Sequence, residues 1–312
     1  MTIALFDFEN YSANENAVAD VMPVIREQLV RRGYRVIEDD TLNRYLIKER
    51  VRSTAHISTQ LCRKMKNDLG VGAVMLGSIY TFNDAFPGAF GLSSRLVDTQ
   101  SSNIIWADFV SASGEDFVKI LGLGMPQNPA ELVARVTDRL FASFERGGTE
   151  KDMEATYRVA VMPFQNKSGQ QDVGMVAASL FLVALARHPQ FMPVEYGDVR
   201  EAIVRSRIMS KGQLDYRNIR QINEQLRVDG ILVGTVDIYN DGVSTNSPPR
   251  ATISARLLDA PKQRVLWLNS GQLGGDDRVV ILDRGKIRTL DNVAYTLIET
   301  LTNDMGRTAW KQ

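Results

Sequence analysis

Residues 3–12, with the sequence IALFDFENYS, return later in the chain as residues 159–168, with the sequence VAVMPFQNKS. The offset between the two stretches is 156 residues, and each places a run of apolar residues in front of an Asn-x-Ser sequence. A short apolar run of this kind is typical of a strand that is buried on both faces of a sheet. Asn and Ser side chains bond to nearby backbone and favour a turn after it. The two stretches therefore predict one buried strand at the start of each half.

The repetition continues in the same order along both halves of the chain. Short-period solenoids repeat every 20 to 50 residues, so a period near 160 predicts a duplicated domain instead. The offset grows by four between Gly77 and Arg95, which predicts an insertion in one hairpin of the second copy. The further matched segments are 69–77 (LGVGAVMLG) with 226–234 (LRVDGILVG), 95–98 (RLVD) with 256–259 (RLLD), and Trp106 with Trp267.

Apolar periodicity and turn residues predict the order β-α-β-α-α-β-β-β-α in each copy. This order places the chain in the α/β class, with two tandem homologous domains whose helices pack on a mixed sheet. We predict domains at residues 1–148 and 158–312, joined by a polar linker at 149–157. Because proline is tolerated only in the first turn of a helix or at a kink, Pro23 predicts that the first helix begins near Asp20.

The composition limits the possible functions. The chain has 312 residues, with 37 Lys and Arg against 37 Asp and Glu, so its net charge is zero. Nucleic-acid binding proteins usually carry a basic excess, so this balance argues against such a partner. No stretch approaches 18 uninterrupted apolar residues, which argues against a membrane-spanning helix. The first residues do not resemble an export signal, so the expectation is either a cytoplasmic protein or an exported one whose signal was removed.

Residues suited to chemistry are few. The chain has one cysteine and two histidines, and neither histidine has a counterpart in the other copy. Cys62 lies on an apolar helical face and aligns with Ile219, which indicates a core position. The pairs 115–116 (ED) and 276–277 (DD) match each other, and we interpret them as turn residues near a helix start rather than as an acid–base pair. The sequence thus predicts no catalytic residues, no metal site and no cofactor.

The strand openings, the LGxxAxxxxG segment from Leu69 and the RLxD and IxW segments up to Trp106 resemble one bacterial envelope family. It includes the curli-secretion lipoprotein CsgG, the penicillin-binding-protein activator LpoB and the N-terminal domain of TolB. The resemblance implies a non-enzymatic module that binds envelope proteins, in the periplasm or at the outer membrane. No lipid-attachment cysteine is present near residue 1, and residues 81–91 are too short for the membrane-crossing hairpins of the family's pore-forming member.

The leading hypothesis is therefore an envelope interaction or scaffold protein, whose two modules bind protein partners in a secretion, cell-wall or surface-structure machine. The alternatives are a self-assembling ring or filament component and a periplasmic small-molecule receptor. Partner contacts are expected in the two loops that differ most between the copies, because exposed aromatic side chains suit binding hot spots. For Phe86 and Phe90, local packing is an equally good interpretation. The candidate partner-binding residues are Phe86, Pro87, Phe90, Asn240, Asp241, Pro248 and Pro249.

Overall fold

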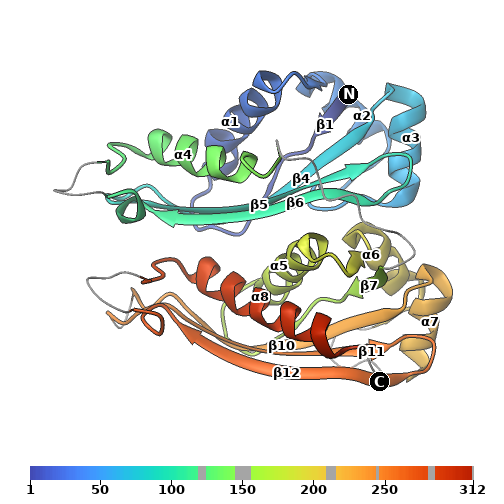
Figure 1. Ribbon diagram of the computed structural model, residues 1–312. Helices are drawn as coiled ribbons and strands as arrows, with labels where there is room; N and C mark the ends of the chain where they lie inside the picture. The colour runs from blue at the N-terminus through green and yellow to red at the C-terminus, as the bar shows by residue number, and fades with distance from the viewer. Residues whose placement is uncertain (119–123, 145–155, 209–215, 244–245, 280–284, 311–312) are drawn as a thin grey trace. The chain divides into compact units, whose positions relative to one another are not determined.

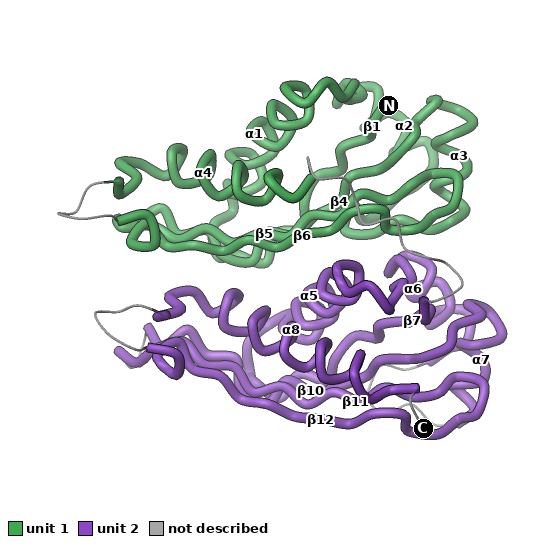
Figure 2. Tube along the Cα trace, viewed as in Figure 1, with its two compact units in different colours: residues 1–149 green, residues 150–312 purple. Residues whose placement is uncertain are grey.

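Each half of the chain folds around its own six-stranded mixed sheet with helices packed against it (Figure 1). The computed structural model describes residues 1–312 except 119–123, 145–155, 209–215, 244–245, 280–284 and 311–312. The chain divides into unit 1, Met1–Thr149, and unit 2, Glu150–Gln312 (Figure 2). The α/β fold class with two similar halves is confirmed. Most of the predicted linker, 149–157, lies outside the described residues.

The elements follow the predicted order in both units. A two-residue strand, β2 or β8, is added in each. Unit 1 contains β1 (Thr2–Leu5), β2 (Glu9–Asn10), α1 (Ala17–Arg31), β3 (Arg35–Val36), α2 (Asp39–Lys48), α3 (Thr59–Leu69), β4 (Ala73–Asn83), β5 (Ala89–Asp98), β6 (Ile104–Ser113), the 3-10 helix η1 (Gly114–Phe117) and α4 (Pro129–Phe141). Unit 2 contains β7 (Tyr157–Val161), β8 (Gln165–Asn166), α5 (Val173–Arg187), β9 (Phe191–Pro193), α6 (Tyr196–Arg205), α7 (Tyr216–Leu226), β10 (Gly230–Asn240), β11 (Arg250–Asp259), β12 (Arg264–Gly274) and α8 (Leu290–Thr308).

The two sheets have the same topology. In unit 1 the strand order is β3-β1-β4-β5-β6, with parallel pairing of β1 to β3 and β4 and antiparallel pairing from β4 to β6. Unit 2 repeats this as β9-β7-β10-β11-β12. A register shift between Ile79 and Thr81 recurs between Val236 and Ile238, at an offset of 157. The copies therefore share details of the backbone, and they can be compared position by position.

Alternating side chains of the first strand enter two different cores. Ile3 and Leu5 belong to the core beneath α1 and α4, whereas Ala4 and Phe6 belong to the core beneath α2 and α3. This alternation is the period of an extended strand that is covered on both faces. Cys62 is fully buried in the second core, which confirms its predicted role as a core residue.

The duplicated tryptophans anchor the sheet to the last helix of each unit. The Trp106 ring stacks on Phe141 of α4, with 6.0 Å between ring centroids. Its indole N–H donates to the Ser143 hydroxyl at 3.0 Å. Trp267 is buried to a similar extent and donates to Asp304 of α8 at 2.8 Å. Both tryptophans thus bury their rings and satisfy their indole N–H groups, which is how a tryptophan is accommodated in a core.

The expected start of the first helix was wrong. Pro23 predicts a start near Asp20, but α1 begins at Ala17 and contains Pro23 in its interior. Ala17, Val21, Ile25 and Leu29 are all fully buried at four-residue spacing. Pro23 is exposed, on the side of the helix away from this apolar stripe. Burial of the stripe over its full length stabilises the helix enough to offset the hydrogen bond that proline removes.

Candidate functional site

The tip of the β4–β5 hairpin presents one large aromatic side chain to solvent. Phe86 is 74% exposed, and the Phe86–Pro87 peptide bond is cis. Hydrogen bonds between near neighbours hold the turn around it. Gly88 N–H donates to Ala85 O at 2.7 Å, and Ala85 N–H donates to Asn83 Oδ1 at 3.0 Å. Gly88 has φ +75°, which glycine adopts without strain. The exposed ring therefore projects from an ordered turn.

The first residue of η1, Gly114, packs against the backbone of this tip. Gly114 N–H donates to Gly88 O at 3.0 Å. A Cβ atom at Gly114 would lie 2.0 Å from Pro87 O, so a larger residue cannot occupy this position without moving the tip. Close approach of two backbones is one of the uses of glycine in folded proteins. The position of Phe86 is thus fixed by contacts that do not involve its own side chain.

A shallow pocket opens beside Phe86, between the hairpin tip and the start of α4. Its apolar wall comes mainly from proline rings and Leu132, and a carboxylate and two amides lie at its edge. Binding sites are commonly concave and apolar with a few polar groups that orient the ligand. The lining residues are Asp84, Phe86, Pro87, Gly88, Pro126, Gln127, Asn128, Pro129 and Leu132.

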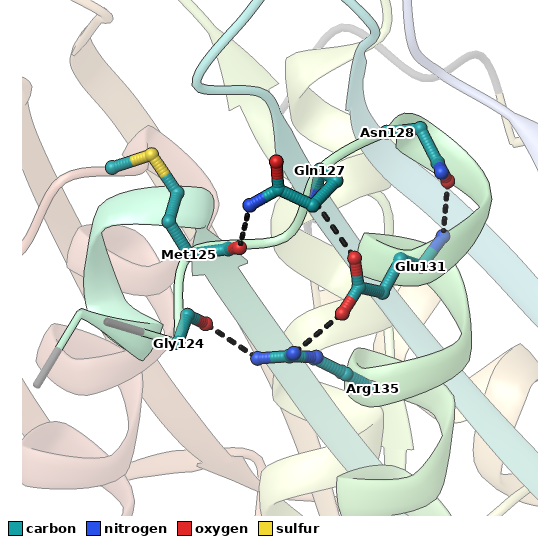
Figure 3. A network of polar contacts seen from close by, with 6 residues as sticks. All are labelled: Gly124, Met125, Gln127, Asn128, Glu131 and Arg135. Atoms are coloured by element: carbon teal, nitrogen blue, oxygen red, sulfur yellow. Dashed lines mark hydrogen bonds and ion pairs between the residues drawn. The ribbon is translucent and has the colours of Figure 1, made fainter. Parts of the chain in front are cut away.

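A polar network fixes the α4 side of the pocket (Figure 3). Asn128 Oδ1 accepts a hydrogen bond from the Glu131 N–H at 2.9 Å, and Glu131 accepts one from the Gln127 N–H at 2.7 Å. Arg135 forms an ion pair with Glu131 and also donates to Gly124 O. The hydrogen bond from Gln127 and the neighbouring Arg135 hold the pKa of Glu131 below its usual range. Glu131 is therefore a charged cap of the helix start.

Phe90 is not available to a partner, so its proposed exposed role was wrong. Its side chain is 1% exposed and belongs to the core beneath α1 and α4. The ring packs edge-on against Phe82, its cross-strand neighbour, with 5.6 Å between centroids. Of the two interpretations left open for this residue, local packing holds. Phe86 and Phe90 lie in the same turn-rich stretch of sequence, but only Phe86 lies in the connection between β4 and β5.

The predicted residues of unit 2 mostly shape their own turn. Asn240 Oδ1 accepts from the Gly242 N–H at 2.8 Å, and Asp241 Oδ1 accepts from the Val243 N–H at 3.1 Å. Pro248 is half-buried, and Pro249 is buried with its carbonyl accepting from the Gly275 N–H at 2.8 Å. Both carboxamide and carboxylate therefore serve as turn caps. Residues 244–245 lie outside the described part of the chain.

Sequence reasoning missed two features of these tips. Val243 is 80% exposed and is the side chain in unit 2 that most resembles Phe86 in its setting. The pocket also takes residues 126–129 and Leu132, which lie about forty positions from the hairpin in the sequence. The only local signal for them is the PxxP spacing of Pro126 and Pro129. Their proximity to Phe86 follows from the antiparallel path of the sheet, which a single sequence does not reveal.

Residues suited to metal binding do not cluster in the described part of the chain. No group of three or more His, Cys, Asp or Glu residues there could hold a metal ion. The acidic pairs cap turns: Asp116 Oδ2 accepts from the Ser113 N–H at 2.8 Å, and Asp277 Oδ2 accepts from the Gly274 N–H at 2.6 Å. Our interpretation of these pairs as turn residues is confirmed. None of the described helices is long and apolar enough to cross a bilayer.

Comparisons with known proteins give matches among solved structures. No family model matches the chain, and no curated protein does. The PelC dodecamer from Paraburkholderia phytofirmans matches with 19% identity over 47% of this chain and 85% of PelC, at a TM-score of 0.32. Lipoprotein GNA1162 from Neisseria meningitidis matches with 12% identity over 47% of this chain and 99% of its own, also at 0.32. The LpoB C-terminal domain from Salmonella enterica matches with 12% identity over 43% and 93%, at 0.31.

LpoB and TolB, two of the members named for the resemblance seen in the sequence, are among the matched structures. For CsgG the resemblance stays a prediction.

Proposed function

We propose that this chain is a non-enzymatic interaction protein of the bacterial envelope, in which two similar modules present different hairpin tips to protein partners. The observation that carries the proposal is Phe86, a large aromatic side chain that is 74% exposed on an ordered turn. Covering a phenylalanine side chain contributes about 1.5–3 kcal/mol to association. Aromatic side chains that fill a partner's pocket dominate many interfaces.

The order of the tip supports the same function. Binding by a mobile loop loses affinity to the entropy of ordering it, whereas a preformed loop avoids that loss. Here Gly88, Gly114 and the capped start of α4 hold the tip without help from the Phe86 ring. The ring thus remains available, and the adjacent pocket can accept a side chain of the partner.

The envelope setting is supported by the sequence motifs shared with the CsgG, LpoB and TolB family. The class of machine follows from the same motifs: secretion, cell-wall synthesis or assembly of a surface structure. The second tip carries the smaller exposed side chain Val243 instead of an aromatic one, and the connection between β10 and β11 spans nine residues against five in unit 1. The two modules are therefore expected to bind different partners or different parts of one partner.

Site-specific photo-crosslinking tests the proposal. A photoreactive phenylalanine at position 86 of the full chain, in cells, should give one defined protein adduct. The same group at the exposed position of Val30, on the outer side of α1, is the matched control and should give none. Equal labelling at both positions, or none at position 86, would show that the tip is not an interface.

A second candidate, self-assembly, is favoured by the edge strand β12. Residues 265–274 contain no charged residue and no proline, although such residues usually protect a sheet edge. Val265 and Leu268 are also exposed there. Against this, Asn269 Oδ1 already accepts from the Ser270 N–H at 2.8 Å, which blocks part of the edge. Light scattering across concentrations separates the candidates, since a strict monomer contradicts assembly through β12.

A further inference from the structure

One exposed aliphatic side chain occupies the same position in both units. Ile47 in α2 is 76% exposed and Val204 in α6 is 63% exposed, and their positions differ by the offset of 157 that relates the neighbouring segments. The hairpin tips differ between the units in length and composition, whereas this position keeps a β-branched aliphatic residue in both. Packing does not require it, since α2 buries Leu42, Tyr45 and Leu46 instead.

The end of the helix does not require this aliphatic residue either. Val51 N–H donates to Leu46 O at 2.9 Å and Arg50 N–H to Ile47 O at 3.0 Å. Ile208 N–H donates to Ile203 O and Arg207 N–H to Val204 O, both at 3.1 Å. This is the Schellman pattern of helix termination. Its usual apolar contact joins the two residues whose hydrogen bond spans five positions, here Leu46 with Val51 and Ile203 with Ile208. Ile47 and Val204 contribute only their backbone carbonyls to the pattern.

The second residue after each helix is an arginine whose backbone has the left-handed conformation that favours glycine. Arg50 has φ +55° and Arg207 has φ +51°. A side chain costs about 1 kcal/mol in this left-handed region, and glycine is the common choice there. The chain uses glycine after α3, where Gly70 has φ +63°. Neither Arg50 nor Arg207 forms a side-chain hydrogen bond or ion pair with the described residues, so no contact among those residues compensates for the strain.

Further basic residues lie around each aliphatic side chain. In unit 1 the exposed basic side chains are Arg44, Lys48, Arg50 and Arg52, and in unit 2 they are Arg200, Arg205 and Arg207. Of these, Arg205 is paired with Glu201 at 2.9 Å. Lys48 and Arg205 lie in the last helical turn, where a positive charge complements the helix dipole. Arg50 and Arg207 lie beyond the last turn. The effect of the helix dipole is confined to that turn, so it does not explain these two arginines. A chain with no net charge thus carries a basic, aliphatic corner in each unit.

We infer that these two corners, around Ile47 with Arg50 and around Val204 with Arg207, each bind an acidic peptide segment of a partner protein that also carries an aliphatic side chain. The charge complementarity defines the acidic character of the segment, and the exposed Ile or Val defines its apolar residue. A single aliphatic side chain is a small area for insertion into a bilayer, where an apolar face is normally needed. A peptide needs only one such contact.

The test uses the full chain and a fluorescein-labelled peptide of alternating glutamate and leucine residues, with binding followed by anisotropy. The double variant Arg50→Gly with Arg207→Gly should weaken binding by about ten-fold, because each corner loses a charge. It should not unfold, since glycine relieves the left-handed positions. The matched control is Arg227→Gly, which removes an exposed arginine with φ +50° after α7 and aligns with Gly70. This control should leave peptide binding unchanged.

Further variants separate the possible occupants. Ile47→Ser with Val204→Ser should weaken peptide binding about as much as the arginine variants, and added salt should weaken wild-type binding. Phe86→Ser should not affect it, so failure of the hairpin-tip proposal and failure of this one remain distinguishable. The inference is overturned if the peptide does not bind, if Arg227→Gly weakens binding equally, or if only phosphatidylglycerol vesicles respond to the corner variants. A concentration-dependent dimer that the corner variants abolish would assign the corners to a second copy instead.

Discussion

The β4–β5 hairpin of unit 1 and the β10–β11 hairpin of unit 2 share their strand pairing and register shift but differ in side-chain chemistry. Unit 1 has Phe90 where unit 2 has Ala251, and both are buried. Unit 1 has Tyr80 at the register shift where unit 2 has Asp237. The bulge and strand pairing are the same in both. The fold therefore depends on the backbone pattern, and the side chains on this hairpin were free to diverge.

The divergence is coordinated across neighbouring strands. Tyr80 stacks on Tyr11 with 6.1 Å between centroids and donates or accepts a hydrogen bond with Ser93 Oγ at 2.7 Å. In unit 2 the positions of Tyr11 and Tyr80 hold Lys167 and Asp237, whose charged groups lie 3.5 Å apart. A stacked aromatic pair in one unit is thus replaced by an ion pair in the other. Contacting residues changed together, as expected for positions that couple energetically.

The largest expected effect comes from truncating the aromatic residue that the hairpin buries. Phe90→Ser should lower the free energy of unfolding of unit 1 by about 4 kcal/mol, because it leaves a cavity lined by Phe82 and the core beneath α1 and α4. The control, Phe86→Ser, should change it by less than about 0.5 kcal/mol, because Phe86 is exposed. Urea unfolding followed by hydrogen exchange measures each unit. Equal effects of the two variants would contradict the assignment of Phe86 to the surface.

The pair Phe86 and Phe90 also shows where prediction from sequence stops. The sequence correctly predicted the order of helices and strands in each unit, the core position of Cys62 and a four-residue insertion in one hairpin. It could not separate two phenylalanines four residues apart, because their burial depends on where the strand resumes after the turn. Pro23 gave a wrong helix start for a related reason: the tertiary burial of Ala17 outweighed a local preference.

The next prediction tests whether the stacked pair Tyr11 and Tyr80 of unit 1 can be replaced by the ion pair Lys167 and Asp237 of unit 2. Tyr80→Asp should destabilise unit 1 by about 3 kcal/mol, because a carboxylate replaces a buried ring and gains no partner. Adding Tyr11→Lys recreates the pair of unit 2 and should recover about 1 kcal/mol. A double-mutant cycle by urea unfolding measures this coupling. No recovery in the double variant would show that the ion pair depends on other residues of unit 2.

A smaller effect is a pH dependence of stability that we expect for the Trp267 contact and not for the Trp106 contact. Trp267 and Asn269 donate to Asp304, and these hydrogen bonds lower the pKa of Asp304 from its usual value. A carboxyl whose pKa is lowered on folding stabilises the protein above its unfolded pKa and loses that contribution as the pH falls through the folded value. Unit 2 should therefore lose stability below about pH 4. In unit 1 the acceptor at the same position is the uncharged Ser143.

The variant Asp304→Ser copies the unit 1 arrangement into unit 2. At neutral pH it should cost less than about 1 kcal/mol, because Asp304 is only half-buried and solvent screens its charge. Its difference from wild type should shrink as the pH is lowered toward 3. Thermal unfolding across a pH series provides the measurement, with Ser143→Ala as the pH-independent comparison. A difference that stays constant down to pH 2 would assign the effect to packing instead of charge.

The smallest expected effect is that of the ion pair itself. Lys167 and Asp237 remain 56% and 38% exposed, so Asp237→Asn should change the free energy of unfolding by less than about 0.5 kcal/mol. Even that difference should disappear in 1 M salt, which screens exposed charges. A larger loss that salt does not alter would instead implicate the hydrogen bond that Asp237 Oδ2 accepts from Ser254 at 3.3 Å. Unit 2 would then keep its hairpin through a hydrogen bond to a serine, as unit 1 does between Tyr80 and Ser93.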